Sequence, residues 1–194
     1  MEINAGRMMV AGVLATALAT SVAAAEKGGG EIGAASFDAQ GRLLQPQGYR
    51  EWVFLGAPLT PHGLNDGKAG FPEFHHVYIN PDAHDIYQRS GRFPEGTVIA
   101  KELLLVQKGD YPDGSKNAPS GRGYFADRYN GMDVMVKDSR RFKQSNGWGF
   151  FNFGHDAPPY AEAASAAPAS SCASCHAANA QKDMVFTQFY PILR

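Results

Sequence analysis

The chain has 194 residues, which is enough for one domain with a single sizeable hydrophobic core. Its 18 Lys and Arg residues nearly balance its 19 Asp and Glu residues, giving a formal net charge of -1, and like charges form neither a block nor a stripe. This charge pattern excludes nucleic acid as an expected partner.

The N-terminal segment has the pattern of a secretory signal. Arg7 is followed by the apolar run MMVAGVLATALATSVAAA, whose small last residues are typical of a signal-peptidase site. We therefore predict a signal peptide over residues 1–25, cleaved after Ala25, and a single exported domain over residues 26–194. The run is short and rich in Ala and Thr, unlike a retained membrane anchor, so no membrane association is expected.

The remaining sequence favours short strands over a helical bundle, because Pro, Gly, Asn and Asp interrupt its apolar runs at short intervals. Expected strands lie in REWVFLGA (50–57), EFHHVYIN (73–80), GTVIAKELLLVQKG (96–109) and GWGFFNFG (147–154). GYFADRYNGMDVMVKD (123–138) is expected to form a hairpin that turns at Asn130 and Gly131.

Two segments carry helix signals. NPDAHDIYQRSG (80–91) has Asn80 as a cap, Pro81 at the first helical position and Gly91 as a stop, and SSCASCHAANAQ (170–181) also reads as a helix. The predicted fold class is α+β and mainly β, with an antiparallel sheet of five or six strands and a few short helices.

The only two cysteines lie in the motif Cys172-Ala-Ser-Cys175-His176. In an exported protein this pattern indicates covalent haem c, in which both thiols bond the porphyrin and the adjacent imidazole binds iron. A disulfide would close only a small loop, and a thioredoxin-like pair would need a βαβ context. Zinc would need two more ligands, for which His155 and His176 are the nearby candidates.

The second axial position of the iron distinguishes an electron carrier from a ligand-binding haem. Met184 follows His176 by only eight residues and is badly placed for the opposite face, while Met132 and Met135 read as ordinary strand residues. His75 and His76 remain alternative ligands. We predict an open distal site.

The strand over 96–109 carries one charge on each apolar face. Strict alternation places Lys101 with Ile99 and Leu103, and Glu102 with Ala100 and Leu104. Lys101 either marks a sheet edge or points at a cofactor, where a buried amine would become nucleophilic. The pattern leaves both readings open.

Several segments together resemble the cytochrome P-460 family, in the same order and at similar separations. They are YREWVFLGAPLTPHGLNDGKAGFPEFHHVYINP, GTVIAKELLLV, GYFADRYNGMDVMVKDSRRF, CASCH and DMVFTQFYPILR. The resemblance implies a periplasmic c-type haem protein with a mainly antiparallel β fold, commonly a homodimer, that oxidises hydroxylamine. It also implies that His176 is the proximal iron ligand and that Lys101 is bonded covalently to the porphyrin.

By the same resemblance, Phe71, Glu73 and His75 line the distal pocket. Some relatives carry arginine at the position of His75, and Ala167 does not supply the carboxylate expected near the iron in that loop. Related proteins of the cytochrome c-prime-beta group share the fold, lack the lysine bond and bind gases such as nitric oxide.

We therefore expect oxidation of hydroxylamine to nitrous oxide or nitric oxide, with Glu73 or His75 as the proton acceptor and a periplasmic c-type cytochrome as the electron acceptor. A nitric oxide binding protein and a six-coordinate electron-transfer cytochrome remain the alternatives.

Overall fold

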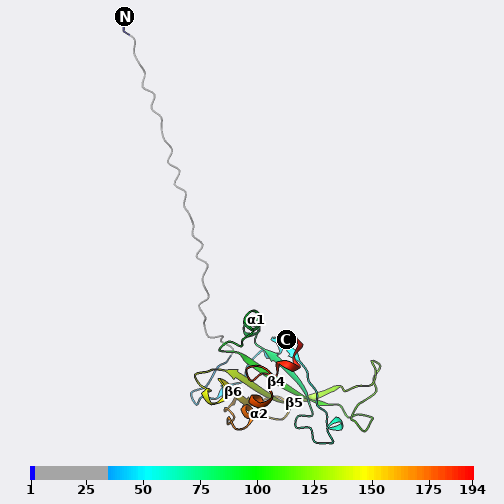
Figure 1. Ribbon diagram of the computed structural model, residues 1–194. Helices are drawn as coiled ribbons and strands as arrows, with labels where there is room; N and C mark the ends of the chain where they lie inside the picture. The colour runs from blue at the N-terminus through cyan, green and yellow to red at the C-terminus, as the bar shows by residue number, and fades with distance from the viewer. Residues whose placement is uncertain (3–34) are drawn as a thin grey trace. The chain divides into compact units, whose positions relative to one another are not determined.

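A five-stranded antiparallel sheet forms the centre of the computed structural model, which describes residues 1–2 and 35–194 (Figure 1). The predicted signal peptide and its cleavage site lie outside the described residues. Strand order follows the chain, so each strand pairs with its sequence neighbour. The strands are β2 (Val53–Gly56), β3 (Phe74–Ile79), β4 (Val98–Val106), β5 (Ala126–Lys137) and β6 (Trp148–Asn152).

The remaining elements are short. A two-stranded sheet joins β1 (Leu43–Leu44) to β7 (Ala163–Ala164), and the α-helices are α1 (Pro81–Ser90) and α2 (Cys172–Asn179). The 3-10 turns are η1 (Tyr49–Glu51), η2 (His62–Leu64), η3 (Lys143–Ser145), η4 (Thr187–Phe189) and η5 (Pro191–Leu193). The predicted fold class is confirmed.

The central sheet has a different core on each face. On one face, Ile99 and Met135 pack with buried residues of α1, α2 and the C-terminal segment. On the other face, Val98 and Ala100 pack with residues of β1, η1 and β7. Both faces are covered, which explains why β4 is apolar on both sides.

Glu102 is the buried charge of the second face. Its side chain is 1% exposed and accepts hydrogen bonds from Tyr49 Oη at 2.7 Å, Tyr160 Oη at 2.8 Å and both Nε and Nη2 of Arg50. Burial raises the pKa of this carboxyl, but the hydrogen bonds from Arg50 and the two tyrosines outweigh it and hold the pKa below its usual value. Glu102 therefore joins β4 to η1 and to the segment before β7.

The expected hairpin over residues 123–138 is wrong, because β5 runs unbroken through Asn130 and Gly131. Gly131 has φ +135°, and the register between β4 and β5 shifts between the pairs Glu102–Met132 and Leu104–Tyr129. The Asn-Gly pair thus forms a bulge in a long strand and not a turn.

The helix α1 begins and ends as predicted, at Pro81 and before Gly91, which has φ +67°. Asn80 occupies the cap position, but its side chain makes no cap hydrogen bond. Instead its Oδ1 accepts a hydrogen bond from the Val98 N–H at 2.8 Å. Asn80 thus ties the start of α1 to the start of β4.

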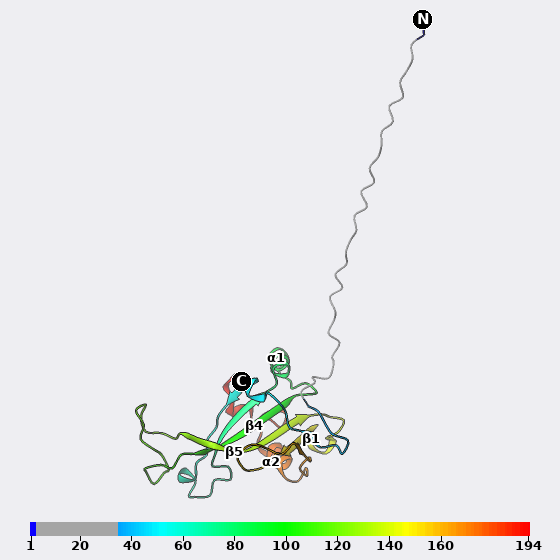
Figure 2. The ribbon, with the colours of Figure 1, turned by 180° about the vertical axis from the view of Figure 1, so that it is seen from behind.

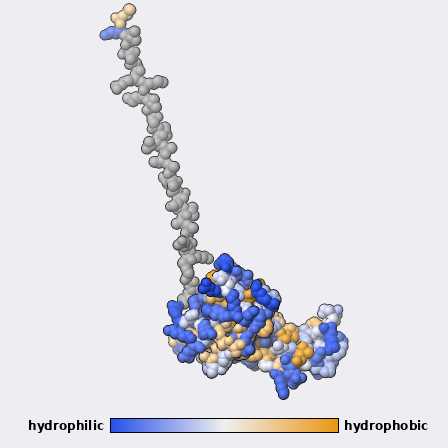
Figure 3. All heavy atoms as spheres, in the orientation of Figure 1, coloured by the Kyte–Doolittle hydropathy of each residue, from blue (hydrophilic) through white to orange (hydrophobic). Residues whose placement is uncertain are grey.

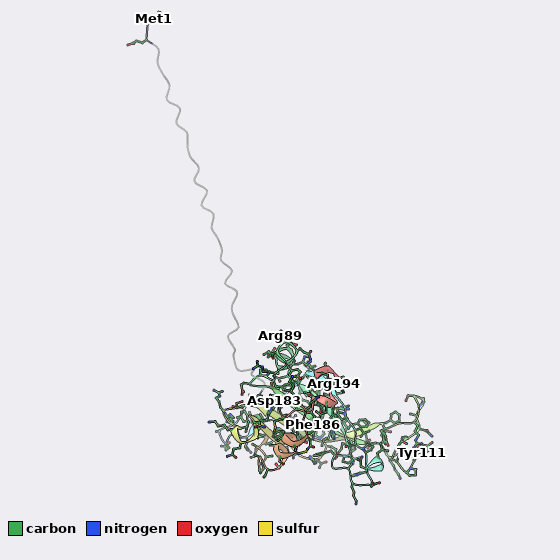
Figure 4. The ribbon with its side chains drawn as sticks, in the orientation of Figure 1. Met1, Arg89, Tyr111, Asp183, Phe186 and Arg194 are labelled. Carbon is green, nitrogen blue, oxygen red and sulfur yellow. The ribbon has the colours of Figure 1, made fainter. Side chains whose placement is uncertain are left out.

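Residues 107–125, between β4 and β5, extend away from the sheet and are called the arm here. Both ribbon views show it projecting from the body (Figures 1 and 2). Tyr111 lies near its tip (Figure 4). Arg122 donates to Asp113 at 2.6 Å and lies 3.7 Å from the centre of the Tyr111 ring. The arm is therefore held by its own polar contacts.

Within the described residues, no helix has the length and apolar character needed to cross a bilayer. On the face shown in Figure 3, hydrophilic residues cover much of the body, and hydrophobic residues gather toward the arm.

Candidate haem site

The two cysteines lie one turn apart on α2, which packs against β6. Cys172 and Cys175 are exposed free thiols. Residues three apart on a helix project from neighbouring positions of one face, so both sulfur atoms are presented on the same side. This arrangement suits two thioether bonds to one porphyrin edge.

The imidazole of His176 is held from three sides. Its ring centre lies 4.6 Å from that of Phe150 on β6 and 4.8 Å from that of Phe186. Its Nδ1 lies 2.6 Å from the carbonyl oxygen of Met184. Because a carbonyl can only accept, Nδ1 carries the proton, and Nε2 is the nitrogen available to iron.

Burial lowers the pKa of His176, with a smaller contribution in the same direction from the charge of Lys101. The imidazole is therefore neutral at neutral pH, as a metal ligand must be.

Lys101 lies on the same sheet face as Ile99, and its side chain makes two contacts. Its Nζ lies 2.9 Å from Asp133 Oδ2 on the neighbouring strand β5 and 4.4 Å from the centre of the Phe71 ring. The side chain is 25% exposed. Lys101 is therefore ion-paired and partly accessible to solvent.

Asp133 is itself fixed by β6, because Asn152 Nδ2 donates to its Oδ1 at 2.7 Å. Charges of Lys101 and Asp133 both act on the pKa values of His75 and His176. The two charged groups thus lie within electrostatic range of both histidines.

Glu73 and His75 each have one buried polar atom without a hydrogen-bond partner among the described residues. Asn130 Nδ2 donates to Glu73 Oε1 at 3.0 Å, whereas Glu73 Oε2 and His75 Nε2 make no hydrogen bond with the described residues. Burial first, and then the charge of Lys101, lower the pKa of His75 to about 4. Buried polar atoms normally make hydrogen bonds. Two such atoms without a hydrogen-bond partner therefore indicate a site where a ligand binds.

Phe71 stands beside these groups with 45% of its surface exposed. Its ring is edge-on to His75 at 5.9 Å and lies 6.5 Å from His155. The structure thus brings Phe71, Lys101 and His75 together. The family resemblance implied that these residues of separate segments share one site.

Other candidates lie elsewhere. His76 projects toward Phe54 and Phe74, with ring distances of 5.9 and 6.4 Å, while Met132 is buried in the core of the second face. Met184 is on the proximal side, because its carbonyl binds His176. Ala167 packs against the core that contains Ile99 and Met135. Its N–H donates to the Phe150 carbonyl at 2.7 Å.

Sequence reasoning missed the residues that hold the site together, namely Asn130, Asp133, Phe150, Asn152 and Phe186. Met184 was considered only for its sulfur, although its carbonyl makes the contact. Strand alternation could have placed Asp133 on the face of Met135, but the register that sets it opposite Lys101 is not visible in the sequence.

These residues fit a covalently attached haem c. Two thiols and a neutral imidazole with an available Nε2 lie on one side, and unpaired polar atoms with an accessible aromatic ring lie near Lys101. Among residues 1–2 and 35–194, no group of three or more His, Cys, Asp or Glu side chains could hold a metal ion by itself.

Comparison with known proteins agrees with this reading. The model of the family described as cytochrome P-460 matches residues 46–187, which include every residue of the site described above. A comparison with curated proteins gave no significant match. The chain therefore belongs to the cytochrome P-460 family of c-type haem proteins.

Proposed function

We propose that the chain is a periplasmic enzyme that oxidises hydroxylamine to nitrous oxide or nitric oxide at an open distal iron position. The observation that carries this proposal is Lys101, whose ammonium lies beside Phe71 and Asp133 on the sheet face that also bears His75. In the family, the lysine at this strand position is bonded to the porphyrin.

A bound haem would supply a redox-active iron with a position for a small ligand. Cys172 and Cys175 would attach this group, and His176 would provide the ligating nitrogen. The Phe150 and Phe186 rings orient the imidazole.

Oxidation of hydroxylamine releases protons together with electrons, so a distal group must accept protons. Burial holds the pKa of His75 at about 4, so its imidazole is neutral at neutral pH, and its Nε2 has no hydrogen-bond partner among the described residues. The same holds for Glu73 Oε2, while Asn130 donates to Oε1. We assign proton acceptance to this pair, with Glu73 kept in orientation by β5.

The first test is the absorption spectrum of the reduced holoprotein, compared with that of Lys101→Met. The wild type is expected to show a strongly red-shifted Soret band, which returns to the ordinary c-type position in Lys101→Met because the amine is absent. Lys116→Met, on the arm, is the matched control and should keep the wild-type spectrum. Identical spectra for wild type and Lys101→Met would contradict the lysine bond.

Turnover is tested separately, by following hydroxylamine consumption with an artificial electron acceptor. Wild type is expected to produce nitrous oxide or nitric oxide, and Glu73→Gln and His75→Leu to slow turnover about 10²-fold or more, the usual effect of losing an acid–base group. Unchanged rates in both variants would remove Glu73 and His75 from proton acceptance.

A second candidate, nitric oxide binding without turnover, is favoured by Phe71, whose exposed ring could cap a diatomic ligand. Tight nitric oxide binding with no hydroxylamine consumption would support it. A six-coordinate electron carrier would instead bind no external ligand.

Two partners belong to the proposal. A periplasmic c-type cytochrome would accept the electrons, and a second copy of the chain would form a homodimer. The exposed side chains of Phe189 and Ile192, close together in the C-terminal segment, support an apolar contact surface there. Sedimentation at micromolar concentration would distinguish dimer from monomer.

A further inference from the structure

The segment after α2 forms a tight turn with an unusual backbone. Asp183 and Met184 both have left-handed conformations, with φ of 47° and 64°. The turn is closed by the Val185 N–H, which donates to the Lys182 carbonyl at 2.8 Å. Two successive residues with positive φ are most often an Asn-Gly pair. A residue with a long side chain, such as Met184, is disfavoured in this backbone conformation. Other contacts must therefore hold this turn in place.

The carboxylate of Asp183 is bound by the ends of two strands. Lys137 Nζ, at the end of β5, lies 2.6 Å from Asp183 Oδ2, and Trp148 Nε1, at the start of β6, donates to Oδ1 at 3.2 Å. Lys137 and Trp148 are direct partners across the sheet, and Trp148 is fully buried. We call these three residues the turn clamp.

The Met184 side chain provides a second attachment. It is 6% exposed, and its sulfur accepts a hydrogen bond from Asn146 Nδ2 at 3.5 Å. Met184 is thus held through its side chain and, through Asp183, by the sheet.

The carbonyl of the same residue accepts the proton on His176 Nδ1 at 2.6 Å. The direction of this carbonyl follows from the backbone of the turn, which the clamp attaches to the paired ends of β5 and β6. An acceptor on the second nitrogen of a metal-binding histidine sets the ring orientation and raises the basicity of the ligating nitrogen.

We propose that Asp183 is a positioning residue, which uses Lys137 and Trp148 to set the Met184–His176 hydrogen bond and so tunes the iron through its proximal ligand. The proposal rests on His176 as the proximal ligand, which is part of the proposed function. It does not depend on hydroxylamine oxidation.

The test compares Asp183→Ala, Asp183→Asn and Lys137→Gln as holoproteins. The readouts are the reduction potential and the iron–histidine stretching frequency of the ferrous protein. A weaker hydrogen bond makes Nε2 a poorer donor, which stabilises ferric iron less. We therefore expect a higher potential and a lower stretching frequency in Asp183→Ala.

Smaller shifts in the same direction are expected for the other two variants. Asparagine tolerates the left-handed backbone and keeps an oxygen for Trp148, and Lys137→Gln leaves the carboxylate in place. The double variant Asp183→Asn/Lys137→Gln should shift less than the sum of the single variants, because both act through one contact.

Asp113→Asn is the matched control, since it makes the same substitution at another aspartate with a 2.6 Å ion pair, to Arg122 on the arm. It should leave both readouts unchanged. A folded Asp183→Ala protein with wild-type potential and stretching frequency would overturn the proposal. If Asp183→Ala does not fold, a wild-type potential in Lys137→Gln and Asp183→Asn overturns it equally.

The outcomes separate this proposal from the proposed function. Shifted potentials in a protein without hydroxylamine turnover would support the clamp and reject the activity. Absence of an iron–histidine band in the wild type would reject the open distal site, and the potentials would still decide the role of Asp183.

Discussion

Lys101 and Glu102 are adjacent charged residues on β4, and their side chains point to opposite faces of the sheet. Lys101 faces the haem side and pairs with Asp133, whereas Glu102 faces the second core and binds Arg50 and two tyrosines. Each charge in this apolar strand is compensated by a partner from a distant segment. Their alternation therefore places Lys101 on the face of the candidate haem site and Glu102 in a structural contact.

Asp133 is expected to hold Lys101 in position for the proposed bond to the porphyrin. In Asp133→Asn, the loss of the carboxylate frees the ammonium from its 2.9 Å contact, so we expect a mixture of linked and unlinked haem. Mass spectrometry of the haem peptide measures the linked fraction. Asp127→Asn, an exposed position on the same strand, is the control, and a fully linked Asp133→Asn protein would contradict this role.

Glu102→Gln is expected to destabilise the fold by about 2–3 kcal/mol, because buried donors lose a charged acceptor. The haem spectrum should stay unchanged, since Glu102 lies on the other sheet face. Urea unfolding at neutral pH measures the loss. Glu51→Gln, at an exposed neighbouring position, should cost almost nothing.

The same carboxylate predicts a dependence of stability on pH. The folded pKa of Glu102 is lowered below its unfolded value of about 4.3, so its contribution is present above that value. This contribution is lost as the pH falls through the lower folded pKa. Wild type should therefore lose more stability than Glu102→Gln on acidification, and parallel pH curves for the two proteins would refute this.

At the scale of elements, the bulge in β5 links strand geometry to the haem site. Gly131 has φ +135°, and a Cβ there would lie 2.7 Å from the Gly154 carbonyl oxygen. The preceding residue, Asn130, holds Glu73 at 3.0 Å. The bulge thus aims one side chain at a distal residue, as bulges near functional sites often do.

Gly131→Ala is expected to destabilise the protein by more than about 1 kcal/mol, because both the backbone conformation and the contact with Gly154 oppose a side chain. Thermal unfolding measures the effect. Gly70→Ala is the matched control, since that glycine has no positive φ and no atom within 4 Å of the added Cβ. Equal stability of the two variants would argue against strain at the bulge.

At the scale of the molecule, the protein combines a sheet with two cores and an arm with its own polar contacts. Buried strands exchange their amide hydrogens through global opening, whereas exposed loops exchange through local fluctuations. Hydrogen exchange followed by mass spectrometry is therefore expected to be slowest in β4 and β5 and fastest in residues 107–125. Equal protection of the arm and β4 would mean that the arm is part of the cooperative core.

Local patterns determined much of this architecture. The apolar runs predicted β2, β3, β4 and β6, and a hairpin in place of the unbroken β5. Alternation placed Lys101 and Glu102 on opposite faces, and the spacing of Cys172, Cys175 and His176 predicted haem attachment. These features depend on residues close together in the chain, where the period of a strand or helix decides the direction of a side chain.

The tertiary structure decided what each of these residues contacts. The Asn130–Gly131 pair has the composition of a hairpin turn, yet the pairing of Tyr129 and Met132 with β4 on either side keeps it inside one strand. The pairs Lys101–Asp133, Asn130–Glu73 and Asp183–Lys137 join residues that are 32, 57 and 46 positions apart in the chain. Strand register and packing set such contacts, because a shift of one residue would turn each side chain to the opposite face.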